Sequence, residues 1–219
     1  MISLKYLLIM SRNIITASDL AYAVKLGKFI KKASEKVLSK WDIQWESGVE
    51  SLIKQENGRI YFIFVNNEIF KIGCSECKGG MKTTFAFYKG GLGGSPSLRT
   101  FGIHLLIHEQ LEAGKNVELY GMWNDAIKVK VKGLFGEKEE VIYPSIKSME
   151  DTCRNNYKEV YNKYPPWNFQ ENAEQWPLHI QELYKAQVQQ RGPRVDATPE
   201  PLPTSKSEFE KCIEYLEPM

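Results

Sequence analysis

The spacing of apolar residues near the start of the chain predicts helices. Within residues 18–41, apolar side chains recur at intervals of three and four, which places them on one side of a helix. They are Leu20, Ala23, Val24, Ile30, Val37, Leu38 and Trp41. Ser18 and Asp19 suit its N-terminal cap, whereas Gly27 weakens the helix or marks a close packing contact. We therefore expect residues 1–58 to form a helical N-terminal extension.

A different pattern begins at residue 60. Two short apolar runs, rich in Ile, Phe, Val and Tyr, flank Asn66-Asn67-Glu68. Such residues favour a half-buried sheet, and an Asn pair tolerates the unusual dihedral angles of a tight turn. Residues 60–73 are therefore predicted to form an antiparallel hairpin whose second strand ends at Gly73.

Further elements alternate between helical and strand spacing. Gly114 closes the first of these helices, and two prolines in 164–168 end a later one. The predicted elements are a helix over 97–113, a strand over 116–123, a hairpin over 127–143, a helix over 145–163 and a short helix over 172–188. Residues 191–205 are typical of a linker, and residues 207–217 fit a final short helix.

These elements predict an α/β (α+β) fold. Its core is a small, mainly antiparallel, three-stranded sheet flanked by helices. The core spans residues 59–170 and contains an inserted hairpin at 124–143. Residues 171–219 form a C-terminal helix and a Pro-rich tail.

Composition narrows the class of protein only slightly. The net charge is +2, with 42% hydrophobic and 26% charged residues, as in ordinary globular proteins. The apolar stretch 1–10 is too short to span a bilayer, and Met10 is an alternative start. We read this stretch as a helix packed on the core. Four cysteines occur without an export signal, so we expect a reduced, cytoplasmic protein with no membrane partner.

Several basic residues are candidates for contact with nucleic acid. Residues 77–99 are glycine-rich and basic but lack the ending of a nucleotide-binding P-loop. Strand alternation places three lysines of the 127–143 hairpin on one face. The candidates for DNA contact are Lys78, Lys89, Lys128, Lys130 and Lys132. The alternatives are a flexible surface loop and a solvated face.

The first hairpin carries two tripeptides that resemble a family signature. Arg59-Ile60-Tyr61 and Lys71-Ile72-Gly73 stand where the GIY-YIG nucleases have their two name-giving tripeptides. Lysine also replaces the second tyrosine in a Helicobacter restriction endonuclease of that family. The order of glycine-rich segment, helix, strand and helix over residues 58–170 is similar as well. The resemblance implies a nuclease in which Tyr61 and Lys71 are catalytic.

The same resemblance indicates the other site residues. Glu150 stands where the family keeps a metal-binding glutamate, and Asn168 stands where endonuclease II of T-even phages has an active-site asparagine. The family arginine corresponds best to Lys82, with Arg99 as the rival. Lysine keeps the charge of arginine but loses its two-pronged hydrogen bonding. Cys74 stands near the place of a family histidine.

Elementary chemistry agrees with these roles. One carboxylate such as Glu150 can hold Mg²⁺, or Mn²⁺ in its place, while leaving positions open for water and phosphate. Tyr61 is the expected general base, and such a tyrosine needs a depressed pKa, which the Lys71 ammonium favours. Cys74 and Cys77 lack partners at zinc-ligand spacing. His104 and His108 have a spacing that suits a metal, but we interpret them as ordinary, partly buried histidines.

We therefore expect a Mg²⁺-dependent type II restriction endonuclease. It would cut double-stranded DNA at a specific site and act as a homodimer, with each subunit serving one strand. One alternative is a phage-type or homing-type endonuclease of looser specificity. Another is a non-catalytic DNA-binding relative. Lysine in place of the family arginine is the feature that supports this alternative.

Overall fold

The structure is a computed structural model that describes residues 15–32, 39–123, 127–133 and 136–189. Within 131–143 it describes the backbone. The chain divides into two units, residues 1–184 and 185–219. The first unit contains every described strand. The expected N-terminal helix in 1–10, the linker and the final helix in 207–217 lie outside the described residues.

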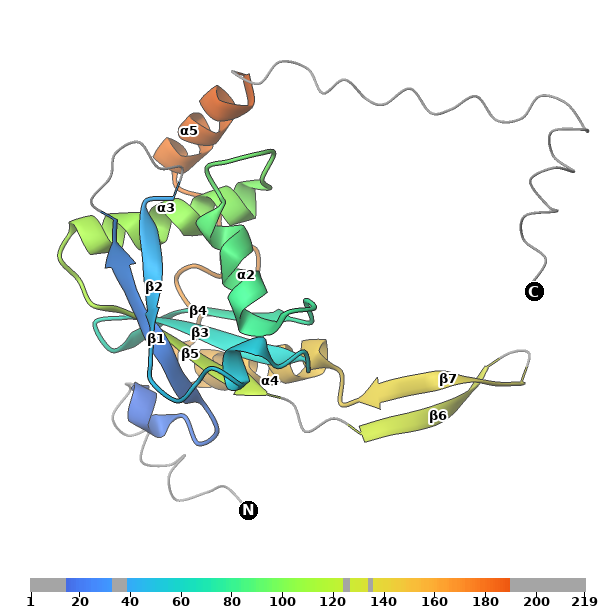
Figure 1. Cartoon of the computed structure of the whole chain (residues 1–219). Helices are drawn as coiled ribbons and strands as arrows, with labels where there is room; N and C mark the ends of the chain where they lie inside the picture. The colour runs from blue at the N-terminus through green and yellow to red at the C-terminus, as the bar shows by residue number, and fades with distance from the viewer. Residues whose placement is uncertain (1–14, 33–38, 124–126, 134–135, 190–219) are drawn as a thin grey trace, which may run out of the picture. The chain divides into compact units, whose positions relative to one another are not determined.

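The centre of the first unit is a five-stranded antiparallel sheet with the strand order β2-β1-β5-β3-β4 (Figure 1). Its strands are β1 (Val24–Lys31), β2 (Trp41–Trp45), β3 (Arg59–Val65), β4 (Glu68–Ser75) and β5 (Val117–Trp123). Strand β3 lies between β4 and β5, and all of its residues are buried. Asn66 and Asn67 have positive φ angles of 48° and 68°, so the Asn pair makes the predicted turn into β4.

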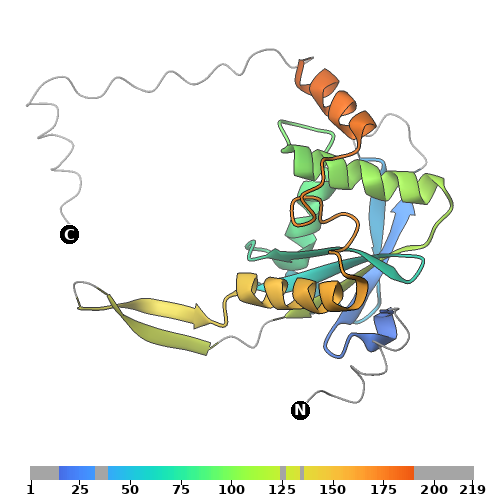
Figure 2. The same cartoon turned by 180° about the vertical axis from the view of Figure 1, so that it is seen from behind.

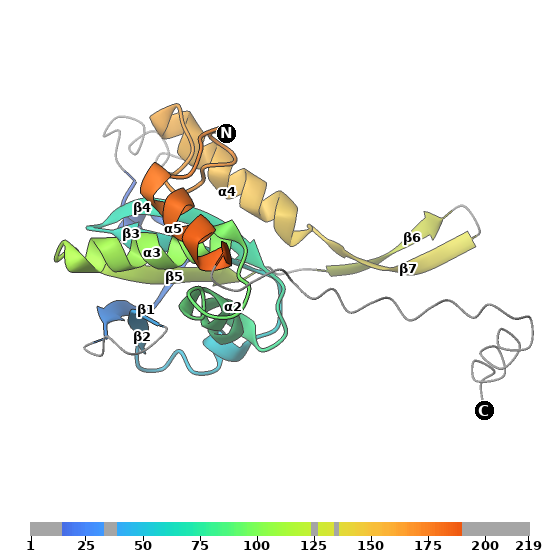
Figure 3. The ribbon, with the colours of Figure 1, turned by 90° about the horizontal axis from the view of Figure 1, so that it is seen from above.

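Helices pack on both faces of this sheet. Helices α2 (Gly80–Lys89) and α3 (Leu98–Glu112) share a core with Tyr61, Ile63 and Val65 of β3. Helix α4 (Ile146–Tyr161) crosses the other face of the sheet (Figure 2). It shares a second core with the alternate residues Ile60, Phe62 and Phe64. Figure 3 shows α4 beside β4, with β1 and β2 at the other edge of the sheet.

The remaining elements are smaller. Two 3₁₀ turns, η1 (Ala17–Asp19) and η2 (Leu52–Lys54), precede β1 and β3. Strands β6 (Ile127–Gly133) and β7 (Gly136–Tyr143) pair with each other in the predicted second hairpin. Helix α5 (Leu178–Gln189) begins later than expected. Among the described residues, no helix is both long and apolar enough to cross a membrane.

The prediction of a helical N-terminal extension is wrong over residues 24–45. This segment forms β1 and β2, which enlarge the sheet from three strands to five. Leu26 and Phe29 are fully buried in the first core. Gly27 allows β1 to lie close to β2, because a Cβ at this position would lie 2.5 Å from the carbonyl oxygen of Gln44 on β2. Pairing with the neighbouring strands therefore determines the structure of this segment, although its apolar residues have helical spacing.

The interpretation of residues 77–99 as a glycine-rich loop is also wrong in part. Residues 80–89 form α2, which buries Met81, Phe85 and Tyr88 at helical spacing. Gly79, with φ 82°, starts this helix in the left-handed region. The other glycines follow the helix, so they bracket it rather than form one continuous loop.

Several of the individually predicted strands and helices are present in the structure. The β3–β4 hairpin, α3, β5, the β6–β7 hairpin and α4 lie within two residues of their expected bounds. Strands β5, β3 and β4 are the three predicted strands and are neighbours in the sheet.

Candidate active site

Tyr61 and Lys71 lie on the same face of two adjacent strands. The register of β3 and β4 pairs Tyr61 with Gly73 and Ile63 with Lys71. Directly paired residues share a face, so Lys71 is diagonal to Tyr61 on the side of α2 and α3. The tight turn therefore sets the strand register that places Tyr61 and Lys71 on one face.

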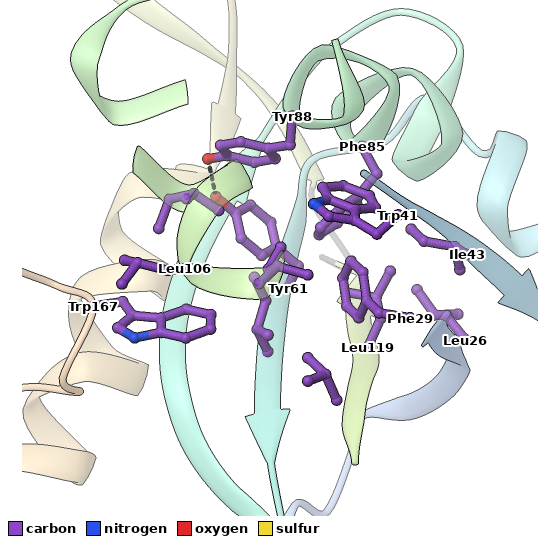
Figure 4. Close-up of a cluster of buried hydrophobic side chains, with 14 of the residues drawn as sticks. Leu26, Phe29, Trp41, Ile43, Tyr61, Phe85, Tyr88, Leu106, Leu119 and Trp167 are labelled. Atoms are coloured by element: carbon purple, nitrogen blue, oxygen red, sulfur yellow. Dashed lines mark hydrogen bonds between the residues drawn. The ribbon is translucent and has the colours of Figure 1, made fainter. Parts of the chain in front are cut away.

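The side chain of Tyr61 is nearly enclosed, with 2% of its surface exposed. Its ring packs at right angles to Phe85, and its hydroxyl is 2.7 Å from the hydroxyl of Tyr88 (Figure 4). Gly73 makes room for it, since a Cβ there would lie 2.3 Å from the ring carbon Cζ. This glycine is required by the tyrosine that faces it across the hairpin.

Burial raises the pKa of Tyr61 well above its ordinary value, and the Tyr88 hydroxyl acts in the same direction. Arg99 opposes that shift without overcoming it. The expected depression of the Tyr61 pKa by Lys71 is therefore wrong for the free protein. Desolvation outweighs the nearby positive charge, because phenolate loses more on leaving water than phenol does.

Lys71 is buried and has a shifted pKa. Its Nζ donates to the carbonyl oxygen of Trp167 at 3.3 Å, and 6% of the residue is exposed. Burial lowers the pKa of Lys71 to about 8, although the Glu171 carboxylate opposes the shift. Lys71 is therefore the group on this face that exchanges a proton near neutral pH.

A segment after α4 covers the outer edge of β4. We call residues 164–172 the strap. Trp167 N–H donates to the carbonyl of Phe70 at 2.8 Å. The Asn168 side chain bonds to both the N–H and the carbonyl of Ile72, at 3.0 Å each. Asn168 is fully buried. In the free protein its two hydrogen bonds therefore take the place of a neighbouring strand at this edge of β4.

Glu150 approaches from α4 and is only 8% exposed. Its Oε2 accepts from Cys74 Sγ at 3.2 Å and from Lys147 Nζ at 3.1 Å, and lies 3.6 Å from Arg154 Nη2. All hydrogen bonds and ion pairs recorded for this carboxylate within the described residues involve Oε2. The second oxygen, Oε1, is the candidate ligand for a cation.

Two charged residues beside Glu150 were not predicted from the sequence. Arg154 is 5% exposed, and its guanidinium donates to Asp151 and to Glu171. Its position four residues after Glu150 on a helix was the available signal. Glu171 comes from the strap, and its pKa is lowered because hydrogen bonding and the charges of Lys71 and Arg154 outweigh burial. No sequence pattern linked Glu171 to α4.

The structure separates the two candidates for the family arginine. The pKa of Arg99, at the start of α3, is raised chiefly by Tyr88, with Tyr61 and Glu150 acting in the same direction. Its guanidinium is therefore within electrostatic range of the other site residues. Lys82 is exposed on α2 and lines a separate hollow of about 140 Å³ with Trp41 and Asp42. Arg99, and not Lys82, thus interacts electrostatically with Tyr61 and Glu150.

The other candidate lysines differ in their surroundings. Lys78 is exposed just before α2. Lys89 forms an ion pair with Asp42 at 2.6 Å, so its charge is already balanced. In the β6–β7 hairpin, Lys128 pairs in register with Ile142, Lys130 with Glu140 and Lys132 with Glu137. Acidic residues thus stand at two of the three paired positions.

His104 is a core residue, as predicted. It is fully buried, stacks on Trp41 and has Nδ1 2.9 Å from the carbonyl of Tyr88. Burial lowers the pKa of His104 to about 4. Arg59, the first residue of β3, is also buried and donates to the carbonyls of Gln55, Asn57 and Cys77. It braces the loop before β3 against the loop after β4.

The donor set suits a hard divalent cation held by a single protein carboxylate. Within the described ranges, no three His, Cys, Asp or Glu residues form a metal-binding group. Glu150 Oε1 would supply one ligand, and water or phosphate would supply the others, as is usual for Mg²⁺. The raised pKa of Cys74, about 12 through burial and Glu150, keeps its sulfur as a thiol.

Comparisons with protein-family models and with curated proteins found no match. Two solved structures are similar to the chain. The restriction endonuclease Hpy188I in complex with product DNA shows 22% identity over 70% of this chain and 86% of that chain, with a TM-score of 0.42. A mutant of EndoII of bacteriophage T4 shows 20% identity over 69% and 95%, with a TM-score of 0.44. Likeness at this level assigns neither a family nor an activity.

Proposed function

We propose that this protein is a Mg²⁺-dependent DNA endonuclease, and more specifically a type II restriction endonuclease. The observation that carries the proposal is the convergence of Tyr61, Lys71, Arg99 and Glu150 from four different elements. The charges of Arg99 and Glu150 act on the pKa values of both Tyr61 and Lys71. A general base, a cation for phosphate and a metal-binding carboxylate are what phosphodiester hydrolysis requires.

Lys71 is the proposed general base. With a pKa of about 8, a substantial fraction of its amine is neutral at mildly alkaline pH and can accept a proton from water. The resulting hydroxide attacks phosphorus, the bond to the leaving oxygen breaks, and solvent returns a proton to that oxygen. Trp167 holds the amine in place through its carbonyl.

Tyr61 is proposed to orient the attacking water rather than to deprotonate it. Its raised pKa keeps it a phenol, and a phenol both donates and accepts hydrogen bonds. Tyr88 shares one of those bonds and fixes the direction of the hydroxyl. Arg99, exposed at the start of α3, is the proposed phosphate contact, because arginine can bind two phosphate oxygens at once.

Glu150 is the proposed ligand of Mg²⁺, with Mn²⁺ as a substitute. The bound cation supplies neutralisation of charge on the phosphoryl group and assistance to the leaving oxygen. Lys147 and Arg154 already contact the other carboxylate oxygen, so the Glu150 side chain is fixed in direction before a cation binds. Asn168 is proposed to hold β4, and thus Lys71, through Ile72.

Double-stranded DNA is the proposed substrate, bound by a homodimer in which each subunit cuts one strand. Lys78, Lys128, Lys130 and Lys132 are proposed as backbone contacts, which give affinity without sequence preference. Lys89 is a weaker candidate because Asp42 neutralises it. Analytical ultracentrifugation tests the dimer: a monomer at all concentrations, with and without DNA, would contradict it.

The experiment that tests the proposed activity is digestion of unmodified phage DNA with Mg²⁺. Wild type should give discrete fragments, whereas Glu150→Gln and Lys71→Met should leave the DNA intact. Thr152→Ala, at an exposed position of the same helix whose hydroxyl bonds to the Ser148 carbonyl, is the control and should still cut. Binding of DNA by wild type without cleavage under Mg²⁺ or Mn²⁺ would favour a non-catalytic DNA-binding protein, and a smear of products would favour a nuclease of looser specificity.

A further inference from the structure

The strap is joined to α4 by one buried ion pair. The Arg154 guanidinium, which is 5% exposed, donates to the Glu171 carboxylate at the end of the strap. The same guanidinium lies 3.6 Å from Glu150, one helical turn earlier. Arg154 therefore connects the helix that carries the proposed metal ligand to the segment that covers β4.

The strap in turn holds the strand that carries Lys71. Trp167 bonds to Phe70 through its N–H and accepts from Lys71 through its carbonyl, and Asn168 takes both backbone groups of Ile72. The strap is closed on itself by Asn172, whose side chain bonds to Tyr164 and Pro165. The strap thus links three consecutive residues of β4 to Arg154 on α4, while Tyr164 at its other end contacts Asn155 and Lys158 of the same helix.

We propose that Arg154 is a positioning residue that fixes Lys71 relative to Glu150 by holding Glu171 and the strap. This inference rests on the proposed function for its catalytic consequence but not for its structural one. A buried ion pair is a weak source of net stability, because desolvation of both charges offsets their attraction. Its directional bonds nevertheless set the relative placement of two elements that share no other recorded ion pair within the described residues.

The test is a set of variants that separates position from folding. Arg154→Gln and Glu171→Gln each break the link, and the double variant Arg154→Gln/Glu171→Gln removes both buried charges. Asp151→Asn is the matched control: it removes an ion pair of the same guanidinium but leaves the link to the strap intact. Arg154→Lys keeps the charge but loses the fork that reaches both Glu150 and Glu171.

Hydrogen exchange at the Ile72 and Trp167 amides is the first readout, and it needs no nuclease activity. Both amides should lose protection, by about tenfold or more, in Arg154→Gln, Glu171→Gln and the double variant. They should stay protected in Asp151→Asn, and amides of β1 and β5 should stay protected in all variants. Unchanged protection in Glu171→Gln would overturn the proposal, as would loss of protection throughout the sheet.

Single-turnover cleavage is the second readout. A displacement of about 1 Å between reacting groups costs about 100-fold in rate, so each link-breaking variant should lose that much. DNA affinity should stay unchanged, and the double variant should be no slower than either single one. Multiplying losses in the double variant would overturn the proposal. An inactive wild type whose variants lose exchange protection as described would refute the proposed function while supporting the positioning role.

Discussion

The two halves of the candidate site bury their polar groups in different ways. On the face of α2 and α3, Tyr61 and Lys71 have neutral partners, the Tyr88 hydroxyl and the Trp167 carbonyl. At the edge near α4, Glu150, Arg154 and Glu171 meet opposite charges. Neutral partners leave desolvation dominant, so the pKa values of Tyr61 and Lys71 shift toward the uncharged forms. Charged partners raise the pKa of Arg154 and lower that of Glu171, so both stay ionised.

This difference divides the chemical work. Lys71, with a pKa of about 8, can gain or lose a proton near neutral pH, which suits proton transfer, whereas Tyr61 stays a phenol that can orient a neighbour. Groups held by opposite charges stay in one protonation state and one orientation, which suits cation binding and placement. The predictions that follow test this division, beginning with the largest expected effect.

Replacing Lys71 with Met should abolish most of the activity. Removal of a general base costs about 100- to 10,000-fold in rate, and the Met side chain fills a similar space without a charge. Single-turnover cleavage measures the effect. Lys115→Met, at an exposed lysine between α3 and β5 that has no proposed role, is the control and should stay near wild type. A Lys71→Met variant that cuts at the normal rate would show that proton transfer lies elsewhere.

The cleavage rate should depend on pH through the pKa of Lys71. A base acts in its deprotonated form, so the rate should rise with pH and level off above the Lys71 pKa of about 8. Between pH 8 and pH 6 the rate should fall about 50- to 100-fold. Single-turnover rates across this range measure the profile. A rate that still rises steeply above pH 9 would instead point to Tyr61 as the base.

Gly73→Ala should destabilise the hairpin face that carries Tyr61. The added Cβ would lie 2.3 Å from the Tyr61 ring and must displace it, at a cost of about 1–3 kcal/mol in the free energy of unfolding. Urea denaturation measures the loss. In Gly90→Ala the new Cβ would lie 3.4 Å from the nearest atom, so that variant serves as the control. Equal stability of the two variants would mean that Tyr61 does not sit over Gly73.

His104 should make the protein less stable in mild acid. Its folded pKa of about 4 lies below the unfolded value of 6.5, so its contribution is fully present above pH 6.5 and is lost as pH falls toward 4. The free energy of unfolding should drop by roughly 1–2 kcal/mol between pH 7 and pH 5 from this group. Urea denaturation of His104→Gln should show a flatter pH dependence. An unchanged slope would place the titrating group elsewhere.

The sequence was informative where local chemistry decides the structure. The Asn66-Asn67 turn determines the register of β3 and β4, and that register places Tyr61 and Lys71 on one face. The prolines after α4 and the glycine after α3 end those helices close to the predicted positions. These features act within a few residues, so a single sequence reveals them.

The sequence was misleading where distant contacts decide. Apolar residues in 24–45 have helical spacing, yet pairing with β5 and burial in the core stabilise two strands there. The low exposure of Tyr61 and the direction of its pKa shift follow from Phe85 and Tyr88 on α2, a helix that was not predicted. Arg154 and Glu171 meet across elements that no spacing rule connects. Their ion pair is visible only in the folded chain.

The most direct test of the proposed activity is sequencing of the DNA ends that the protein produces from unmodified phage DNA with Mg²⁺. Wild type is predicted to give ends that share one short sequence, and Glu150→Gln is predicted to give none. Random ends would contradict site-specific cleavage, and an absence of new ends with wild type would contradict the nuclease activity itself.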